Sequence, residues 1–319
     1  MQRIKTYTVS EREMNTVEAA LKSGLGLTKN QISQAKFRKN GICKNGIQCR
    51  IHETVRQGDI ISLKLEEEQK SSGQLLPFEM KIEVLYEDED LLVVNKPAGI
   101  AVHPSHGHYR DTLANAVTYY YQLKSQQVCI RPVGRLDLET SGVVVFAKNQ
   151  TAAARLEQQK QSGLFRKEYL AVVYGKMEKP EGEITTSIGQ SPDSLNKMKV
   201  DPEGKTAKTC YHVIEKNTIN NRTKRQSEDN YSVLRVRLFT GRTHQIRVHM
   251  ASVGHPLLGD QIYGEAYVNK RIPDLKRAAL HAEKVWLVQP FTGEPLEITA
   301  PVPADMKSLI AISAFIFHG

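Results

Sequence analysis

The chain has 319 residues, 44 Lys and Arg against 35 Asp and Glu, and four cysteines. This length suffices for two domains and for a core without disulfides. The cysteines form no C-x-x-C pair, which argues against a zinc ribbon or a disulfide framework and favours a cytoplasmic protein with free thiols. The formal net charge of +9 favours a nucleic acid partner over a membrane, because no basic amphipathic anchor stands out. The first residues are too polar for a signal peptide, and no run of about 18 apolar residues occurs, so we expect no membrane span.

Residues 1–70 are predicted to form a small basic module, with 13 Lys and Arg against 8 Asp and Glu. Residues 16–22 suit one short helix. Thr28 suits the N-cap of a second helix that runs to about Arg38 and ends at Gly41. This second helix is therefore expected to be basic.

Small strands follow these helices. Asn45-Gly46 predicts a two-residue hairpin turn, and residues 60–65 predict a strand. Two short helices followed by small strands resemble the S-four-like RNA-binding module, named after a ribosomal protein. This resemblance implies RNA contacts by Lys29, Lys36, Arg38 and Lys39. The alternative is a solvated basic helix on an unrelated accessory domain.

A linker over residues 71–80 is expected to precede a larger domain over residues 81–319. Residues 66–74 mix charge with Ser and Gly and lack apolar periodicity, so they indicate a flexible tether. The first elements expected after it are strands over 82–86 and 91–95, a helix from Thr112 to about Leu123 with Asp111 as its cap, and a helix over 151–161 ended by Gly163.

The stretch V-G-R-L-D-L-E-T-S-G at residues 133–142 is a polar turn that leads directly into an apolar run at residues 143–147. Such a run has the length and composition of a strand buried on both faces. Asp137 would then lie on a rigid support at the mouth of that strand. The alternative is an ordinary turn in which Asp137 caps its own backbone.

The last third of the chain contains a very polar patch at residues 217–230, which we interpret as a mobile hairpin tip. A strand is expected over 231–239, followed by a helix that Thr243 caps and Gly254 ends. The apolar tail at residues 306–317 is too short to span a membrane, so we expect it to dock on the core.

The histidines do not predict a metal site. His103, His106 and His108 lie close together, but no acidic partner or further Cys/His pair is suggested nearby. His244, His249 and His255 do not form an H-E-x-x-H pattern.

Three motifs, in this order, resemble those of RluA-type pseudouridine synthases. They are G-R-L-D-x-x-T-S-G around Asp137, R-K-E-Y-L-A-V-V-Y at residues 166–174, and T-G-R-T-H-Q-I-R-V-H-M-A with H-P-L-L-G-D at residues 240–260. The resemblance implies an α+β fold with a mixed, largely antiparallel central sheet, flanking helices and a catalytic cleft. It also implies an isomerase that converts specific uridines in RNA, most often large-subunit ribosomal RNA, to pseudouridine. One departure is Gly134, where the commoner RluA-type wording has His.

The resemblance assigns the catalytic roles to Asp137, Tyr169 and Arg247. Asp137 matches the nucleophile, which must be ionised, so a nearby cation is physically required. Arg247 is our choice for that cation and Arg242 the second candidate, because spacing alone does not rank them. Tyr169 could stack on the uracil or move the C5 proton, and stacking is the safer assignment because a phenol is a poor base at neutral pH.

The remaining site residues are assigned to the substrate. A stacked uridine must be flipped out of its helix, and Arg135 is placed to fill the gap. The residues expected to bind substrate are Arg135, Thr140, Lys167, Arg242, His244 and Gln245. The reaction needs no cofactor, metal or nucleotide, and we expect a monomer. The rival hypothesis is a non-catalytic RNA-binding or ribosome-assembly factor on the same fold.

Overall fold

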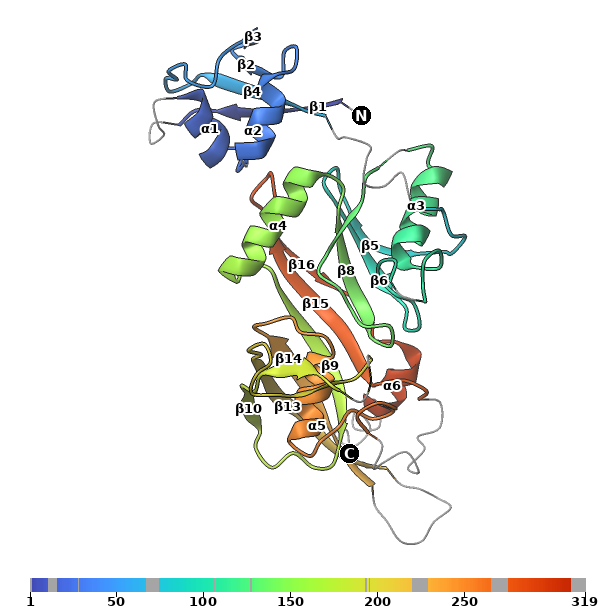
Figure 1. The fold of residues 1–319 in the computed structure, drawn as a ribbon. Coiled ribbons are helices and arrows are strands. Elements are labelled where there is room, and N and C mark those ends of the chain that lie inside the picture. The colour runs from blue at the N-terminus through green and yellow to red at the C-terminus, as the bar shows by residue number, and fades with distance from the viewer. Residues whose placement is uncertain are drawn as a thin grey trace, which may run out of the picture.

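The structure is a computed structural model that describes residues 2–10, 16–27, 29–66, 75–105, 107–126, 128–192, 194, 196–219, 229–264 and 275–310. These residues form a small N-terminal module and a larger domain built on one long sheet (Figure 1). In this described part of the chain, no helix is both long and apolar enough to cross a membrane.

The N-terminal module consists of a four-stranded antiparallel sheet and two helices that share its core. Its elements are β1 (Gln2–Thr8), α1 (Val17–Ser23), α2 (Lys29–Lys36), β2 (Ile42–Lys44), β3 (Ile47–Gln48) and β4 (Ile60–Glu66). The predicted hairpin turn is confirmed, since Asn45 and Gly46 have φ angles of 52° and 83°, the left-handed values that such a turn requires.

Three details of the module differ from the sequence analysis. Strand β1 was not predicted, although it pairs with β4 along its whole length. Helix α2 ends at Lys36, so Arg38 and Lys39 lie beyond it. The predicted N-cap, Thr28, lies outside the described residues.

The larger domain is built on a ten-stranded sheet, which confirms the predicted mixed, largely antiparallel architecture. Its main path runs in the order β10-β13-β14-β9-β15-β8-β6-β5, with β16 paired to β15 and β7 to β8. The strands are β5 (Glu83–Glu87), β6 (Leu91–Lys96), β7 (Arg131–Val133), β8 (Ser141–Ala147), β9 (Arg166–Tyr174), β10 (Glu181–Ile184), β13 (Thr209–Ile219), β14 (Asp229–Leu238), β15 (Leu280–Val288) and β16 (Pro295–Thr299); β11 (Ile188–Gln190) and β12 (Met198–Val200) pair separately. The helices are α3 (Leu113–Leu123), α4 (Gln150–Ser162), α5 (Gln245–Ser252) and α6 (Ala304–Ile310).

Strand β8 is buried along its whole length, as its apolar run predicts. Val144 and Phe146 point into the core that α3 covers, whereas Val143 and Val145 point into the core that α4 covers. Successive side chains of a strand face opposite sides, so two cores require a continuous apolar run. Figure 1 shows α3 and α4 on the two sides of this part of the sheet.

The helix ends correct two predicted caps. Thr112, not Asp111, is the N-cap of α3, and it forms a capping box with Asn115. His244, not Thr243, is the N-cap of α5, and it has a left-handed φ of 55° without a side-chain cap. Helix α4 ends at the left-handed Gly163, as predicted.

Residues at both ends of the larger domain pack against its cores. Residues 67–74 lie outside the described residues, but Leu75, Phe78 and Met80 pack against the main core. The predicted linker over 71–80 therefore extends too far. The predicted docking of the tail is confirmed for α6, where Met306 is fully buried, while residues 311–319 lie outside the described residues. The predicted hairpin tip covers residues 217–230, and residues 220–228 of it lie outside the described residues.

Gly142 of β8 lies opposite Ala282 of the parallel strand β15, where the two backbones come close together. A Cβ atom at this position would lie 2.2 Å from the carbonyl oxygen of Ala282, and its φ is +112°. We expect Gly142→Ala to destabilise the protein by roughly 3 kcal/mol or more, because backbone atoms must move. The matched control is Gly163→Ala, where φ is +78° but no atom lies within 4 Å of the added Cβ, and about 1 kcal/mol is expected. Urea unfolding of both variants tests this, and equal losses would refute the close approach.

Candidate active site

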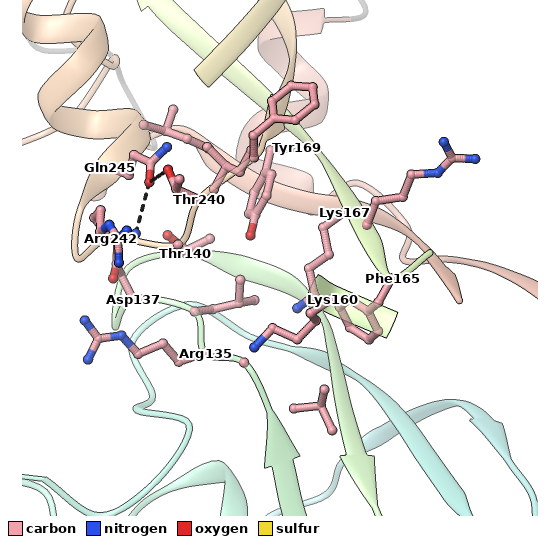
Figure 2. A pocket seen from close by; sticks show the side chains of 18 of the residues that line it. Arg135, Asp137, Thr140, Lys160, Phe165, Lys167, Tyr169, Thr240, Arg242 and Gln245 are labelled. Carbon is pink, nitrogen blue, oxygen red and sulfur yellow. Dashed lines mark hydrogen bonds between the residues drawn. The ribbon is translucent and has the colours of Figure 1, made fainter. Parts of the chain in front are cut away.

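A cavity of about 530 Å³ lies between the loop before β8, the start of β9 and the segment between β14 and α5. Its wall includes residues 132–137, Thr140, Lys160, Phe165, Arg166, Lys167, Tyr169, residues 238–242, Gln245, Ile246 and Leu280. Thus all three motifs of the sequence analysis contribute to one cavity (Figure 2). Its size is within the range of small-molecule sites.

Asp137 is half-buried at one side of this cavity, and its carboxylate makes no hydrogen bond or ion pair to any described residue. The loop is held by its backbone instead. The carbonyl oxygen of Asp137 accepts from Thr140 N at 3.1 Å, and the carbonyl oxygen of Leu138 accepts from Gly99 N at 2.8 Å. This arrangement contradicts the alternative in which Asp137 caps its own backbone.

Lys96 is a buried cation near Asp137 that the sequence analysis did not single out. Its ammonium donates to the carbonyl oxygens of Pro97, Ile100 and Leu138 at 3.0, 2.7 and 3.1 Å. Burial lowers the pKa of Lys96 to about 7, and the charge of Asp137 opposes this shift. The available signal was its place in N-K-P-A-G at residues 95–99, a turn next to a strand.

Arg247 does not form the ion pair with Asp137 that the sequence analysis predicted. Its Nε and Nη2 atoms donate to the two carboxylate oxygens of Asp260 at 2.7 and 2.8 Å, and Nη2 lies 3.3 Å from Glu139 Oε2. Burial disfavours the charge of Arg247, but the hydrogen bonds and charge of Asp260 outweigh it and raise the pKa. Arg247 therefore acts on Asp137 through space.

Glu139 and Asp260 are thus site residues that the sequence analysis missed. Both lie inside quoted motifs, at one of the unspecified positions of the first and at the end of the third. Glu139 also accepts from Ala278 N at 3.3 Å through Oε2, and its backbone oxygen accepts from Arg277 at 3.1 Å. These contacts tie the Asp137 loop to the segment before β15.

Gln245 is fully engaged with the protein, which corrects its predicted role in binding substrate. Its side-chain oxygen accepts from Thr240 Oγ1 at 2.8 Å and from Arg242 N at 3.0 Å. Its amide nitrogen donates to Lys208 O and Thr209 Oγ1, both at 3.0 Å. Because the amide has no remaining donor, Gln245 stabilises the loop at residues 240–245 rather than offering hydrogen bonds to a ligand.

The other two predicted residues of this loop differ in exposure to the cavity. Arg242 lines it, and its Nε donates to Thr206 O at 3.0 Å. No ion pair joins Arg242 to Asp137 in the part of the chain that the structure describes. His244 does not line the cavity and shares a 2.8 Å hydrogen bond with Tyr263. Burial lowers the pKa of His244, and the charge of Asp137 opposes this.

Tyr169 and Thr140 line the cavity, and the hydroxyl of each makes no hydrogen bond within the part of the chain that the structure describes. The Tyr169 ring stands among the lining side chains in Figure 2, and its hydroxyl makes no hydrogen bond to a described residue. Burial and the charge of Asp137 both raise the pKa of Tyr169, so the phenol stays protonated at neutral pH. Thr140 Oγ1 is buried and has no hydrogen-bond partner among the described residues. An unsatisfied buried hydroxyl is costly and suggests that a ligand or water completes it.

The cavity wall is strongly basic. Five of its described residues are Lys or Arg, and Asp137 is its single described acidic residue. Lys167 donates to Val143 O at 2.8 Å, and burial together with the charge of Lys160 lowers the pKa of Lys167 to about 7. Arg135 is exposed and donates to Thr243 Oγ1. This excess of positive charge fits an anionic substrate.

The predicted basic residues of the N-terminal module lie outside the cavity. Lys29, Lys36 and Lys39 are exposed and Arg38 is half-buried. Lys36 lies over the ring of the exposed Phe37, with 4.7 Å between its ammonium and the ring centroid.

The histidines serve other contacts. His108 pairs with Asp111 at 2.8 Å, and His106 lies outside the described residues. Among the described residues, no group of three His, Cys, Asp or Glu side chains is arranged to hold a metal ion.

Comparison with known proteins agrees with these motifs. Residues 90–252 match the family model described as RNA pseudouridylate synthase. The chain is 37% identical over 297 residues to the uncharacterized RNA pseudouridine synthase YhcT of Bacillus subtilis (strain 168), a match that covers 92% of this chain and 91% of the relative. It is 36% identical over 279 residues to the ribosomal large subunit pseudouridine synthase D of Escherichia coli O6:H1, covering 84% and 81%.

A solved structure has the same fold. The human RNA pseudouridylate synthase domain containing 1 superposes with a TM-score of 0.57 and 27% sequence identity, covering 72% of this chain and 87% of that chain.

The buried pair of Arg247 and Asp260 yields a test of what holds the site together. We expect Asp260→Ala to destabilise the protein by about 3–5 kcal/mol, because it leaves a buried guanidinium with only the partly exposed Glu139 as partner. The control is Glu157→Ala, which removes a surface pair with Lys160 and should cost less than about 1 kcal/mol. Chemical denaturation measures both, and a small loss for Asp260→Ala would contradict the role of this pair.

Proposed function

The chain belongs to the RNA pseudouridylate synthase family, and we propose that it isomerises uridines of large-subunit ribosomal RNA to pseudouridine with Asp137 as the nucleophile. The observation that carries the proposal is the Asp137 carboxylate, which makes no ion pair with a described residue and lines the same basic cavity as Tyr169. The RNA is proposed from relatives named as ribosomal large subunit pseudouridine synthase D.

The reaction breaks the bond between ribose C1′ and uracil N1 and forms a bond between C1′ and C5. The C5 proton leaves and N1 becomes N–H, so no redox equivalent or phosphate enters the balance. An anionic oxygen is needed either to trap the sugar carbon or to attack the base. The carboxylate of Asp137 can supply it without first breaking a hydrogen bond or ion pair to a described residue.

The charges around Asp137 suit this role. Lys96 and Arg247 each interact electrostatically with Asp137. Since neither of them forms an ion pair with it within the described residues, the carboxylate is left free to react.

The uridine enters the cavity as a flipped nucleotide, which costs a few kcal/mol of stacking. In this proposal Tyr169 stacks on the uracil, and the Thr140 hydroxyl gains the hydrogen-bond partner that it lacks. The exposed Arg135 fills the gap in the RNA, and Arg242 and Lys167 contact phosphates. Tyr169 takes no part as a ground-state base, because the pKa of its phenol is raised.

The alternative, a non-catalytic RNA-binding or assembly factor, is not favoured by the names of the relatives or by the unpaired Asp137. We further propose that the protein is cytoplasmic and monomeric, and that Lys29, Lys36, Arg38 and Lys39 of the N-terminal module form a second contact with RNA.

We expect Asp137→Asn to lower turnover on the order of a thousand-fold or more, because an amide keeps the shape but is no nucleophile. RNA affinity should stay within a few-fold. Tritium release from RNA carrying [5-³H]uridine measures turnover, and filter binding measures affinity. The control is Asp111→Asn, an exposed carboxylate away from the cavity, which should turn over normally. Retained activity in Asp137→Asn would remove Asp137 from its role.

Lys167 predicts a pH dependence of RNA binding. Its pKa of about 7 lies below its usual value of 10.5, so its positive charge is present below about pH 7 and lost as the pH rises through that value. Affinity for RNA should fall several-fold between pH 6 and pH 8. Lys167→Met should bind weakly at both values and show a flatter profile, whereas the exposed Lys199→Met should keep the profile of the wild type. Parallel profiles for all three proteins would exclude Lys167 as the titrating contact.

A further inference from the structure

In the described part of the chain, the contacts between the N-terminal module and the larger domain include the following three. Gln31 of α2 donates to Thr151 Oγ1 of α4 at 3.0 Å, and both side chains are buried. Lys5 of β1 lies 3.4 Å from Asp90 Oδ2 and 3.8 Å from the ring centroid of Phe291. At Gly26, an added Cβ atom would lie 2.6 Å from Arg155 Nε. We call these seven residues the dock.

The larger domain's side of the dock is preorganised. Asp90 is 3% exposed, and its carboxylate accepts from Asn149 Nδ2 at 2.7 Å and from Gln289 Nε2 at 3.3 Å. Arg155 lies 4.8 Å from the ring centroid of Phe291 and donates to Pro290 O. A buried carboxylate is stable only with cations and hydrogen-bond donors around it, and Lys5 brings such a cation from the module.

The contact also requires a particular sequence on the module's side. Gly26 has a φ of +57° and no side chain, so the connection between α1 and α2 can lie directly on Arg155. The amide of Gln31 and the hydroxyl of Thr151 are removed from water, which is unfavourable unless they bond to each other. A module that only drifted on a tether would leave both groups hydrated.

Helix α4 connects the dock to the active site. Thr151 and Arg155 lie in its first half, and Lys160 near its end lines the cavity. The nine steps along the chain from Thr151 to Lys160 span about 14 Å at the helical rise of about 1.5 Å per residue. The module is therefore held at a set distance from the cavity by a rigid element.

We propose that the dock holds the N-terminal module in one orientation and thereby determines which uridines of a structured RNA are modified. An RNA must then meet the module and the cavity together, so only a uridine at the matching distance enters. The effect on RNA rests on the proposed function, whereas the docked state does not.

The dock can be opened by two independent changes. Lys5→Glu places a second negative charge beside Asp90 at a partly exposed position. Gln31→Ala combined with Thr151→Val removes the buried hydrogen bond while keeping α2 and α4 well packed. The matched control is Lys22→Glu, which makes the same charge change on an exposed side chain of the module that pairs with Glu18.

Small-angle X-ray scattering of each full-length protein without RNA measures docking. We expect a larger maximum dimension for both dock variants and no change for Lys22→Glu. Activity is then measured on two probes, a protein-free transcript of large-subunit ribosomal RNA and a short single-stranded oligonucleotide with one uridine. On the transcript, the ratio of the main modified uridine to all others should fall about tenfold. On saturating oligonucleotide, turnover should stay within about twofold of the wild type.

Unchanged scattering in both dock variants would overturn the dock. A released module with unchanged selectivity would overturn its role in choosing the uridine. If the wild type made no pseudouridine on either probe, the proposed function would fail, and the scattering would still judge the docked state by itself.

Discussion

The close approach of β15 to β8 at Gly142 is the constraint on which the active site depends. Strand β8 is buried on both faces, between the cores that α3 and α4 cover. The loop that carries Asp137 runs into the start of this strand and therefore inherits its position from the core. A side chain carried by a rigid element keeps its position without hydrogen bonds of its own, which explains how Asp137 can be fixed in place and still make no ion pair or hydrogen bond to a described residue.

Buried charges form the next layer around that loop. Arg247 binds Asp260 and Glu139, and Arg277 binds Asp305 at 2.7 and 3.0 Å as well as the backbone of Glu139. Buried ion pairs contribute little net stability compared with apolar packing. Their value here is geometric, since Glu139 lies two residues from Asp137 and links it to α5 and to β15.

The N-terminal module and the cavity are two parts of one RNA-binding surface in our interpretation. Because the two domains belong to one chain, each is present at a high effective concentration near the other, so a small interface suffices to keep them in contact. The dock then adds orientation, which a tether alone does not provide. In this interpretation the cavity performs the reaction, and the docked orientation of the N-terminal module selects the uridine.

The sequence by itself determined the local features and the family. Asn45-Gly46 specified its hairpin turn, and the apolar run at residues 143–147 specified a strand buried on both faces. Three motifs indicated the reaction. Each of these features depends only on residues close together in the sequence. Only the tertiary structure determined which charged and polar side chains pair with each other. Arg247 pairs with Asp260, 13 residues away, instead of Asp137. Gln31 forms a hydrogen bond with Thr151, 120 residues away. These partners depend on how distant strands and helices pack together. The spacing of residues along the sequence does not predict that packing.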